Sequence, residues 1–149
     1  RETTRVTTAG IRPMKWWDIS PVWKIDAEVF GPTAWSPEAF WSELARDDRY
    51  YVVIEDPPQG YAGLWLNPPD ADVQTIAVAP AARGRGLGGL LLAHLLEYAR
   101  GQHCRRLSLE VKAGNPAQQL YEKFGFTVVR VRPRYYPDFT DAHVMGLDL

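Results

Sequence analysis

The stretch that decides the fold is Ile76-Ala77-Val78-Ala79-Pro80-Ala81-Ala82-Arg83-Gly84-Arg85-Gly86-Leu87-Gly88-Gly89. It holds a short apolar strand, a proline that ends the strand, and four glycines in six residues with arginines between them, just before a leucine-rich helix. Glycines let the backbone approach a ligand closely, and the free N–H groups of a helix start offer donors and a positive dipole end to phosphate. The stretch therefore predicts a phosphate-binding turn, since a merely flexible loop does not explain the interleaved arginines.

A second interpretation of these glycines is a dinucleotide-binding fold. Gly84, Gly86 and Gly89 match Gly-x-Gly-x-x-Gly, and Glu110 follows 21 residues after the last of them, where that fold places an acid for the ribose. However, residues 79–83 separate the strand from the first glycine, and two arginines lie in the turn. Only about 38 residues remain after position 111, too few for further β-α units. We therefore place this interpretation second.

Hydrophobic periodicity and helix breakers define the elements around the stretch. Helices are predicted over residues 16–30 and 37–45, the second with Ser36 as N-cap and Pro37 at the first helical position. Gly31-Pro32 separates the two. Further helices are predicted over 90–100 and 117–124, and strands over 50–55, 61–66, 73–79, 107–111, 126–132 and 143–149.

The order of these elements predicts the fold class. Two helices, a β meander and then β-α-β-α-β-β give a mixed α/β fold, with a central mixed sheet of about six to seven strands flanked by about four helices. Only the middle β-α-β has to be parallel, because a helical crossover joins its strands. Neither a repeat nor a linker is evident, so residues 1–149 are expected to form a single domain.

Composition argues against several classes of protein. No apolar run approaches the ~20 residues of a membrane helix and no signal peptide is evident, so we expect a cytoplasmic protein without a membrane partner. Cys104 is the only cysteine and the three histidines are scattered, so neither a disulfide nor a metal is expected. With a net charge of −1 and no reading motif, direct contact with nucleic acid is not expected.

Charge is distributed unevenly along the chain. Residues 1–82 hold 7 Lys/Arg against 12 Asp/Glu, whereas residues 83–134 hold 10 Lys/Arg against three glutamates. This asymmetry suits a site that binds an anion on one side and a cation on the other. Solvated helix faces without a function would give the same distribution, and both interpretations stay open here.

Two motifs resemble those of the GNAT acetyltransferases. Residues 76–88 contain the Gln/Arg-x-x-Gly-x-Gly/Ala core of that family's acetyl-CoA motif, and residues 120–126 resemble its Leu-Tyr-x-x-x-Gly-Phe element. Shorter pieces extend the resemblance to the bacterial ribosomal-protein-alanine acetyltransferases of the RimI type: Phe30 with Trp35-Ser36, Leu109-Glu110-Val111, Arg134-Tyr135-Tyr136 and Asp141-Ala142-His143-Val144-Met145. The resemblance implies the GNAT acyl-CoA N-acyltransferase fold, acetyl-CoA as co-substrate and no metal.

The resemblance also implies roles for single residues. The strand Ile76-Ala77-Val78 would pair its backbone with the pantetheine arm, as an extended ligand adds to a sheet edge. Glu110 would be the general base, Tyr121 the general acid toward the departing thiolate, and Asn115 a hydrogen-bond partner of the cofactor arm. The pyrophosphate would be held by the turn, namely Arg83, Gly84, Arg85, Gly86, Leu87, Gly88 and Gly89.

The sequence departs from the family at Asn115. The family spaces its Asn and Tyr seven residues apart, whereas Asn115 and Tyr121 are six apart. One residue fewer turns a helix face by ~100°. Because Phe124-Gly125-Phe126 anchors Tyr121 in the motif, the open assignment is Asn115, which could equally be a helix cap before Pro116.

The implied chemistry suits an N-terminal amine. A protein α-amine has a pKa of ~7.8 and is partly neutral near pH 7.5, whereas a lysine amine at ~10.4 is almost fully charged, so a modest base is enough for the former. Alternation places Leu107, Leu109 and Val111 on one face of their strand and Glu110 on the other, where we expect helical cover. The alternatives are a strand-end glutamate paired with an arginine and, for Tyr121, a core tyrosine.

The implied acceptor is a protein N-terminus, most simply the N-terminal alanine of a small-subunit ribosomal protein. Trp35, Tyr135 and Tyr136 are expected to line the acceptor path, although loop aromatics without a function are an alternative. A monomer or weak dimer is expected. Two other functions stay open: acetylation of lysine side chains or small amines by the same fold, and a non-catalytic acyl-CoA-binding module.

Overall fold

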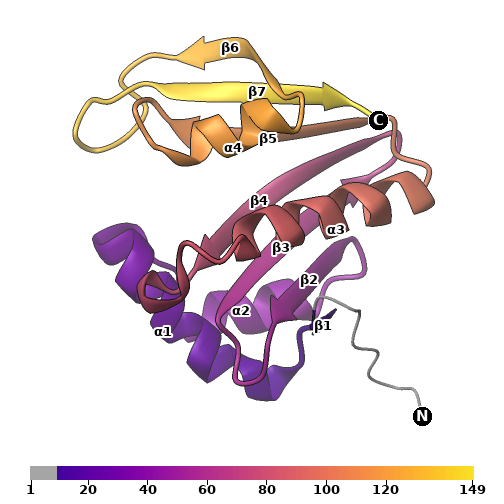
Figure 1. Ribbon diagram of the computed structural model, residues 1–149, viewed down its shortest axis with the longest axis vertical. Coiled ribbons are helices and arrows are strands. Elements are labelled where there is room, and N and C mark those ends of the chain that lie inside the picture. The colour runs from indigo at the N-terminus through magenta and orange to yellow at the C-terminus, as the bar shows by residue number, and fades with distance from the viewer. Residues whose placement is uncertain (1–9) are drawn as a thin grey trace.

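The computed structural model describes residues 10–149, which form one mixed sheet with helices packed on it (Figure 1). In this range the sheet has seven strands in the order β1-β2-β3-β4-β5-β7-β6, and all neighbours are antiparallel except β4 and β5. The predicted mixed fold and its single parallel pair are therefore confirmed. The elements are β1 Ile11–Pro13, α1 Ile19–Phe30, α2 Pro37–Leu44, β2 Arg49–Ile54, β3 Gly60–Asn67, β4 Asp70–Val78, α3 Leu87–Gly101, β5 Arg106–Lys112, α4 Ala117–Lys123, β6 Thr127–Arg132 and β7 Ala142–Asp148.

Several boundaries differ from the prediction, each for a physical reason. β1 was not predicted, because three residues ending in a proline carry little strand signal, and proline is tolerated there since β1 pairs only with β2 at the sheet edge. β4 begins at Asp70, three residues early, because pairing outweighs the low strand preference of aspartate. α3 begins at Leu87, also three residues early, so Gly88 and Gly89 are helical despite their poor helix propensity.

The predicted helix over residues 16–30 is in fact two elements. A 3₁₀ turn, Trp16–Asp18, precedes α1. The carboxylate of Asp18 accepts two hydrogen bonds of 2.7 Å from the guanidinium of Arg12 and one of 2.8 Å from the backbone N–H of Lys15. These bonds hold the tight turn and fix the start of α1 against β1.

The start of α2 follows the prediction. The hydroxyl oxygen of Ser36 accepts a hydrogen bond of 3.2 Å from the backbone N–H of Ala39, with Pro37 at the first helical position. A side-chain oxygen at the N-cap stabilises a helix by satisfying an N–H group without an intrahelical partner. The local sequence therefore determines this helix start.

Two apolar cores lie on opposite faces of the sheet. On one face α3 and α4 pack on the sheet through residues such as Leu91, Leu95 and Tyr121, with Leu107 and Val111 of β5 among their partners. On the other face α1 and α2 pack on β2, β3 and β4, and this second core contains no residue of β5. No helix between residues 10 and 149 is long and apolar enough to cross a membrane.

The parallel strands β4 and β5 pair only at their first residues and then diverge. The partners are Asp70 with Arg106, Ala71 with Leu107 and Asp72 with Ser108. Figure 1 shows the two strands close together at these ends and far apart at their arrowheads. An extra residue, Gln74, lies in β4 because Gly63 and Leu64 of β3 face Thr75 and Val73. A bulge of this kind bends and twists its strand, which suits the divergence.

Candidate active site

The outer edge of β4 is open beyond the point of divergence. Ile76, Ala77 and Val78 pair with β3 on one side, and no described strand pairs with them on the side of β5. Alternate N–H and C=O groups of an edge strand point outward and are available to an extended ligand. The structure thus provides, at the predicted residues, the free strand edge that the pantetheine arm would need.

The glycine-rich turn lies directly after this edge and opens α3. Gly84 and Gly86 have φ angles of +83° and +77°, a conformation that residues with a side chain rarely adopt. None of the backbone hydrogen bonds of the described chain uses an N–H group of residues 84–89 as donor. Gly86 is also the N-cap of α3, so these free N–H groups are at the positive end of the helix dipole. The turn therefore has the donors that a phosphate group requires.

The remaining two glycines of the turn serve helix packing. A Cβ at Gly88 would lie 3.6 Å from Leu120, and one at Gly89 would lie 3.8 Å from Leu120 and 4.0 Å from Phe124. The first turn of α3 is thereby packed against α4. The four glycines thus have two distinct roles. Gly84 and Gly86 allow a backbone conformation with positive φ, whereas Gly88 and Gly89 allow close contact between α3 and α4.

The two arginines of the turn differ in their surroundings. Arg85 forms a bidentate pair with Glu55, with distances of 3.1 Å and 2.5 Å between guanidinium and carboxylate. Arg83 is exposed; its backbone N–H donates to the carbonyl of Pro80, whereas its guanidinium has no hydrogen-bond or ion-pair partner within residues 10–149. Arg83 is therefore free for an anionic ligand, whereas Arg85 has to leave Glu55 to bind one.

Glu110 lies on the predicted face of β5, but the predicted helical cover is wrong. Leu109 and Val111 are buried on the opposite face, while 33% of the Glu110 side chain is exposed. The reason is that α1 and α2 pack on β2 to β4 and do not extend over β5. Its Oε2 atom is 2.6 Å from the Nε atom of Arg132 on β6, so the predicted alternative of an arginine pair is observed. Its Oε1 atom has no such partner within residues 10–149.

Tyr121 lies on the face of the sheet opposite to the side chain of Glu110. It belongs to the α3/α4 core and packs on Phe126, with ring centroids 6.1 Å apart. Burial, with a smaller contribution from the neighbouring Tyr136, raises the pKa of Tyr121 to about 12. Its hydroxyl has no hydrogen-bond partner among the described residues, so it can donate to a ligand. The ring of Tyr121 is part of the core, in agreement with the predicted alternative. Its hydroxyl is without a partner among the described residues, so the role of general acid stays a prediction.

The side chain of Asn115 lies at the start of α4, one residue before the N-cap Pro116. Its Oδ1 atom accepts a hydrogen bond of 2.9 Å from the backbone N–H of Ala117. This matches the predicted alternative of a helix cap before Pro116. This bond uses the side-chain oxygen, while the amide Nδ2 atom has no hydrogen-bond partner among residues 10–149, so the cofactor-binding role of Asn115 stays a prediction.

Tyr136 is the member of the predicted acceptor pair that lies near Glu110. Burial raises the pKa of Tyr136, and Glu110 and then Tyr135 raise it further. Tyr135 is 52% exposed, and the guanidinium carbon of Arg132 lies 5.7 Å from the centroid of the Tyr135 ring. The loop between β6 and β7 thus brings both tyrosines to the Glu110–Arg132 pair, and their role in the acceptor path stays a prediction.

Trp35 lies in the segment that connects α1 and α2. Its ring is half-buried and lies against Phe40 and Tyr51, with centroid distances of 5.1 Å and 6.3 Å. The hydroxyl of Tyr51 donates a hydrogen bond of 3.0 Å to Gln74, the extra residue of β4. Trp35 is thereby placed near the bulge, whereas no hydrogen bond, ion pair or ring contact between residues 10 and 149 joins it to Glu110.

Sequence reasoning missed two charged neighbours of Glu110. Arg132 lies two strands away from it across β7, and only the sheet register reveals their pairing. Burial raises the pKa of Asp72, and the carboxylates of Asp70 and Glu110 raise it further. The parallel pairing of Asp72 with Ser108 places it beside Glu110, and no sequence signal identifies this position.

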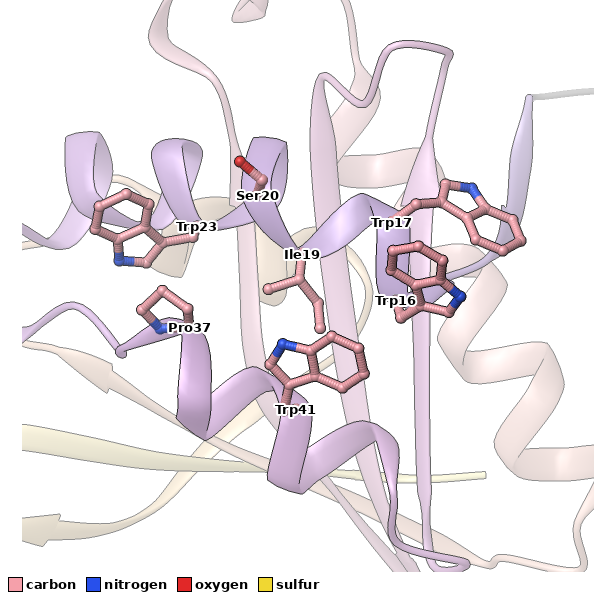
Figure 2. A pocket seen from close by; sticks show the side chains of 7 residues that line it. All are labelled: Trp16, Trp17, Ile19, Ser20, Trp23, Pro37 and Trp41. Atoms are coloured by element: carbon pink, nitrogen blue, oxygen red, sulfur yellow. The ribbon is translucent and has the colours of Figure 1, made fainter.

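A separate aromatic hollow lies on the outer side of α1 and α2, with a volume of about 460 Å³ (Figure 2). Trp16 stacks on Trp41 at its edge, with a centroid distance of 6.2 Å. The hollow shares no residue with the predicted site: it is lined by Trp16, Trp17, Ile19, Ser20, Trp23, Pro37 and Trp41. Within residues 10–149 there is also no group of three or more His, Cys, Asp or Glu side chains arranged to hold a metal.

Comparison with known proteins gives a consistent result. The model of the acetyltransferase (GNAT) family matches residues 16–126. A provisionally named ribosomal protein bS18-alanine N-acetyltransferase of Bacillus subtilis is 39% identical over 148 residues, which are 96% of this chain and 97% of the relative. N-alpha-acetyltransferase RimI of Mycobacterium tuberculosis is 40% identical over 134 residues, with 84% and 83% covered. The crystal structure of the ribosomal-protein-S18-alanine N-acetyltransferase from Escherichia coli matches with a TM-score of 0.82 at 28% identity, with 93% and 92% covered.

Proposed function

We propose, since this chain belongs to the GNAT acetyltransferase family, that it transfers an acetyl group from acetyl-CoA to the N-terminal α-amine of a protein. The observation that carries the proposal is the divergence of β4 from β5 beside a turn of free N–H groups. The names of the relatives support the N-terminal alanine of a ribosomal protein as the acceptor.

The residues present fit an acyl-CoA. The open edge of residues 76–78 offers backbone hydrogen bonds to the amides of a pantetheine arm. The N–H groups of residues 84–89 and the guanidinium of Arg83 offer donors and positive charge to a diphosphate. Acetyl-CoA, when bound, supplies an acetyl thioester as the acyl donor.

Glu110 is suited to take a proton from the attacking amine, directly or through a water molecule. Its Oε2 atom is paired with Arg132, which leaves Oε1 without a partner among the described residues and available for this task. The exposure of Glu110 also suits an acceptor that arrives from outside, because a protein N-terminus can reach a carboxylate that no helix covers. The negative charges of Asp72 and Glu110 favour a cationic chain end on this side of the sheet.

Tyr121 is suited to donate a proton to the leaving thiolate. A pKa of about 12 keeps its hydroxyl protonated at neutral pH, and the hydroxyl has no partner in the described chain that would hold the proton back. A thiol has a pKa of ~8.5, so the thiolate is a modest base and one well-placed hydrogen bond is sufficient help.

The test is a comparison of three acceptors at saturating acetyl-CoA, with thiol release as the readout. The first is a peptide with a free N-terminal alanine and no lysine, the second the same peptide with a blocked N-terminus and one lysine, and the third a polyamine. We expect turnover of the first to exceed that of the others by at least tenfold. Preference for the second or third would show a lysine or small-amine acetyltransferase instead. Binding of acetyl-CoA without thiol release with any acceptor would show a non-catalytic module.

A further inference from the structure

Asp26 of α1 is a buried carboxylate that the proposed chemistry does not use. It is 2% exposed. Its Oδ2 atom accepts a hydrogen bond of 2.6 Å from the backbone N–H of Trp35, and its Oδ1 atom accepts one from the hydroxyl of Tyr61. One side chain therefore fixes the backbone between α1 and α2 to the middle of the sheet.

The connection continues from Tyr61 to the strand with the open edge. The hydroxyl of Thr75 donates a hydrogen bond of 3.3 Å to the hydroxyl oxygen of Tyr61. Thr75 follows the extra residue of β4 and precedes Ile76, where the open edge begins. Burial, then the hydrogen bond with Asp26, raises the pKa of Tyr61, which keeps its hydroxyl protonated as the donor.

A purely structural role explains Asp26 poorly. Within the described chain it has no cationic partner, and a buried carboxyl group without one is costly to keep. Asp18, the other buried aspartate of the chain, has Arg12 as a bidentate partner. Apolar residues would hold α1 on the sheet at lower cost, so the hydrogen bonds of Asp26 are more readily explained by the position they give to Trp35.

We propose that Asp26 is a positioning residue for the acceptor: through Tyr61 and Thr75 it fixes Trp35 relative to the bulge of β4. The inference rests on the proposed function, because it takes Trp35 as part of the acceptor path. The acyl-CoA edge does not depend on Asp26, since β3 pairing holds residues 76–78. Loss of the carboxylate therefore weakens use of the acceptor and leaves binding of the donor unchanged.

The experiment compares Asp26→Asn and Tyr61→Phe with Asp18→Asn as the matched control. Asp18→Asn also alters a buried aspartate at the start of the same helix. The hydrogen bonds that it weakens include those from Arg12 of β1 but none from Trp35, so it does not affect Trp35. The acceptor is whichever amine of the three-acceptor panel the wild type turns over fastest. The readouts are KM and kcat for that acceptor, the Kd of coenzyme A by calorimetry, thermal unfolding, and hydrogen exchange of the backbone N–H groups of residues 33–36.

We expect Asp26→Asn to raise the acceptor KM about tenfold, as misplacement of a substrate-positioning group does, with kcat and the Kd of coenzyme A within twofold. Tyr61→Phe raises KM less, because the bond to Trp35 remains. Asp18→Asn lowers the unfolding temperature and leaves KM unchanged. Exchange at residues 33–36 accelerates in Asp26→Asn only.

Equal effects of Asp26→Asn and Asp18→Asn on KM would overturn the inference, and so would an unchanged KM in a folded Asp26→Asn protein. If Asp26→Asn does not fold, an unchanged KM in Tyr61→Phe overturns it. If the wild type turns over no acceptor, the proposed function has failed, and hydrogen exchange still decides the positioning: unchanged protection of residues 33–36 would overturn it.

Discussion

Replacement of Gly86 by alanine tests the turn on which the proposed function depends. A Cβ at this position has no atom within 4 Å, so the change introduces no clash, and the whole effect comes from the φ angle of +77°. An alanine in the left-handed region costs about 1–2 kcal/mol. The free turn can relax to avoid this strain, whereas the bound turn has to restore it to present its N–H groups. The Kd of coenzyme A should therefore rise about 5- to 30-fold, since about 1.4 kcal/mol corresponds to a factor of ten.

Isothermal titration of each variant with coenzyme A measures this change. Gly101→Ala is the matched control, because Gly101 ends the same helix, is not in the left-handed region and also has nothing within 4 Å of an added Cβ. That control should bind coenzyme A as the wild type does and unfold at the same or a slightly higher temperature, since alanine is favoured over glycine in a helix. If Gly86→Ala binds within twofold of Gly101→Ala, the free N–H groups of the turn do not hold the diphosphate.

Three further predictions concern single side chains. Glu110→Gln should lower kcat about 10²-fold and leave the Kd of coenzyme A unchanged, whereas Ser108→Ala on the same face should change neither kcat nor Kd; equal rates of thiol release in both variants would show that Glu110 is not the general base. Tyr121 has an ordinary pKa of ~10 when unfolded and about 12 when folded, so its contribution to stability is present below pH ~10 and is lost as the pH rises to about 12. Urea unfolding should thus show a steeper alkaline loss for the wild type than for Tyr121→Phe, and parallel curves would contradict this. Glu55→Gln releases Arg85 and should lower the Kd of coenzyme A about two- to fivefold at low salt, with a smaller effect at high salt. An unchanged or higher Kd would mean that Arg85 does not bind the ligand.

Local signals predicted the elements whose stability is local. Ser36 and Pro37 mark the start of α2 because a cap needs only neighbouring residues. The glycines at 84 and 86 mark the turn because their φ angles are a property of that backbone. By contrast, the first residues of β4 and of α3 were missed, since Asp70 and Gly88 have poor intrinsic propensity and adopt their structure through distant partners.

The sequence indicated which residues form the candidate site, but not how they are arranged in space. Alternation along β5 placed Glu110 opposite Leu109, and the structure confirms this. Its expected cover was wrong, because the reach of α1 and α2 across the sheet depends on how two layers pack, which β5 alone does not encode. The bond between Asn115 and the first backbone N–H of α4 agrees with the capping alternative, and the cofactor-binding role stays a prediction.

The sequence by itself determined the order of elements, the donor-rich turn and the choice of residues with suitable chemistry, because these depend on residues close together along the chain. Only the tertiary structure decided that β4 and β5 part after three pairs, that Arg132 meets Glu110 across β7, and that Asp26 joins Trp35 to Tyr61. The reason is physical: strand register, a bulge and the packing of helices on a sheet are set by contacts between segments far apart in the chain, so no single segment specifies them.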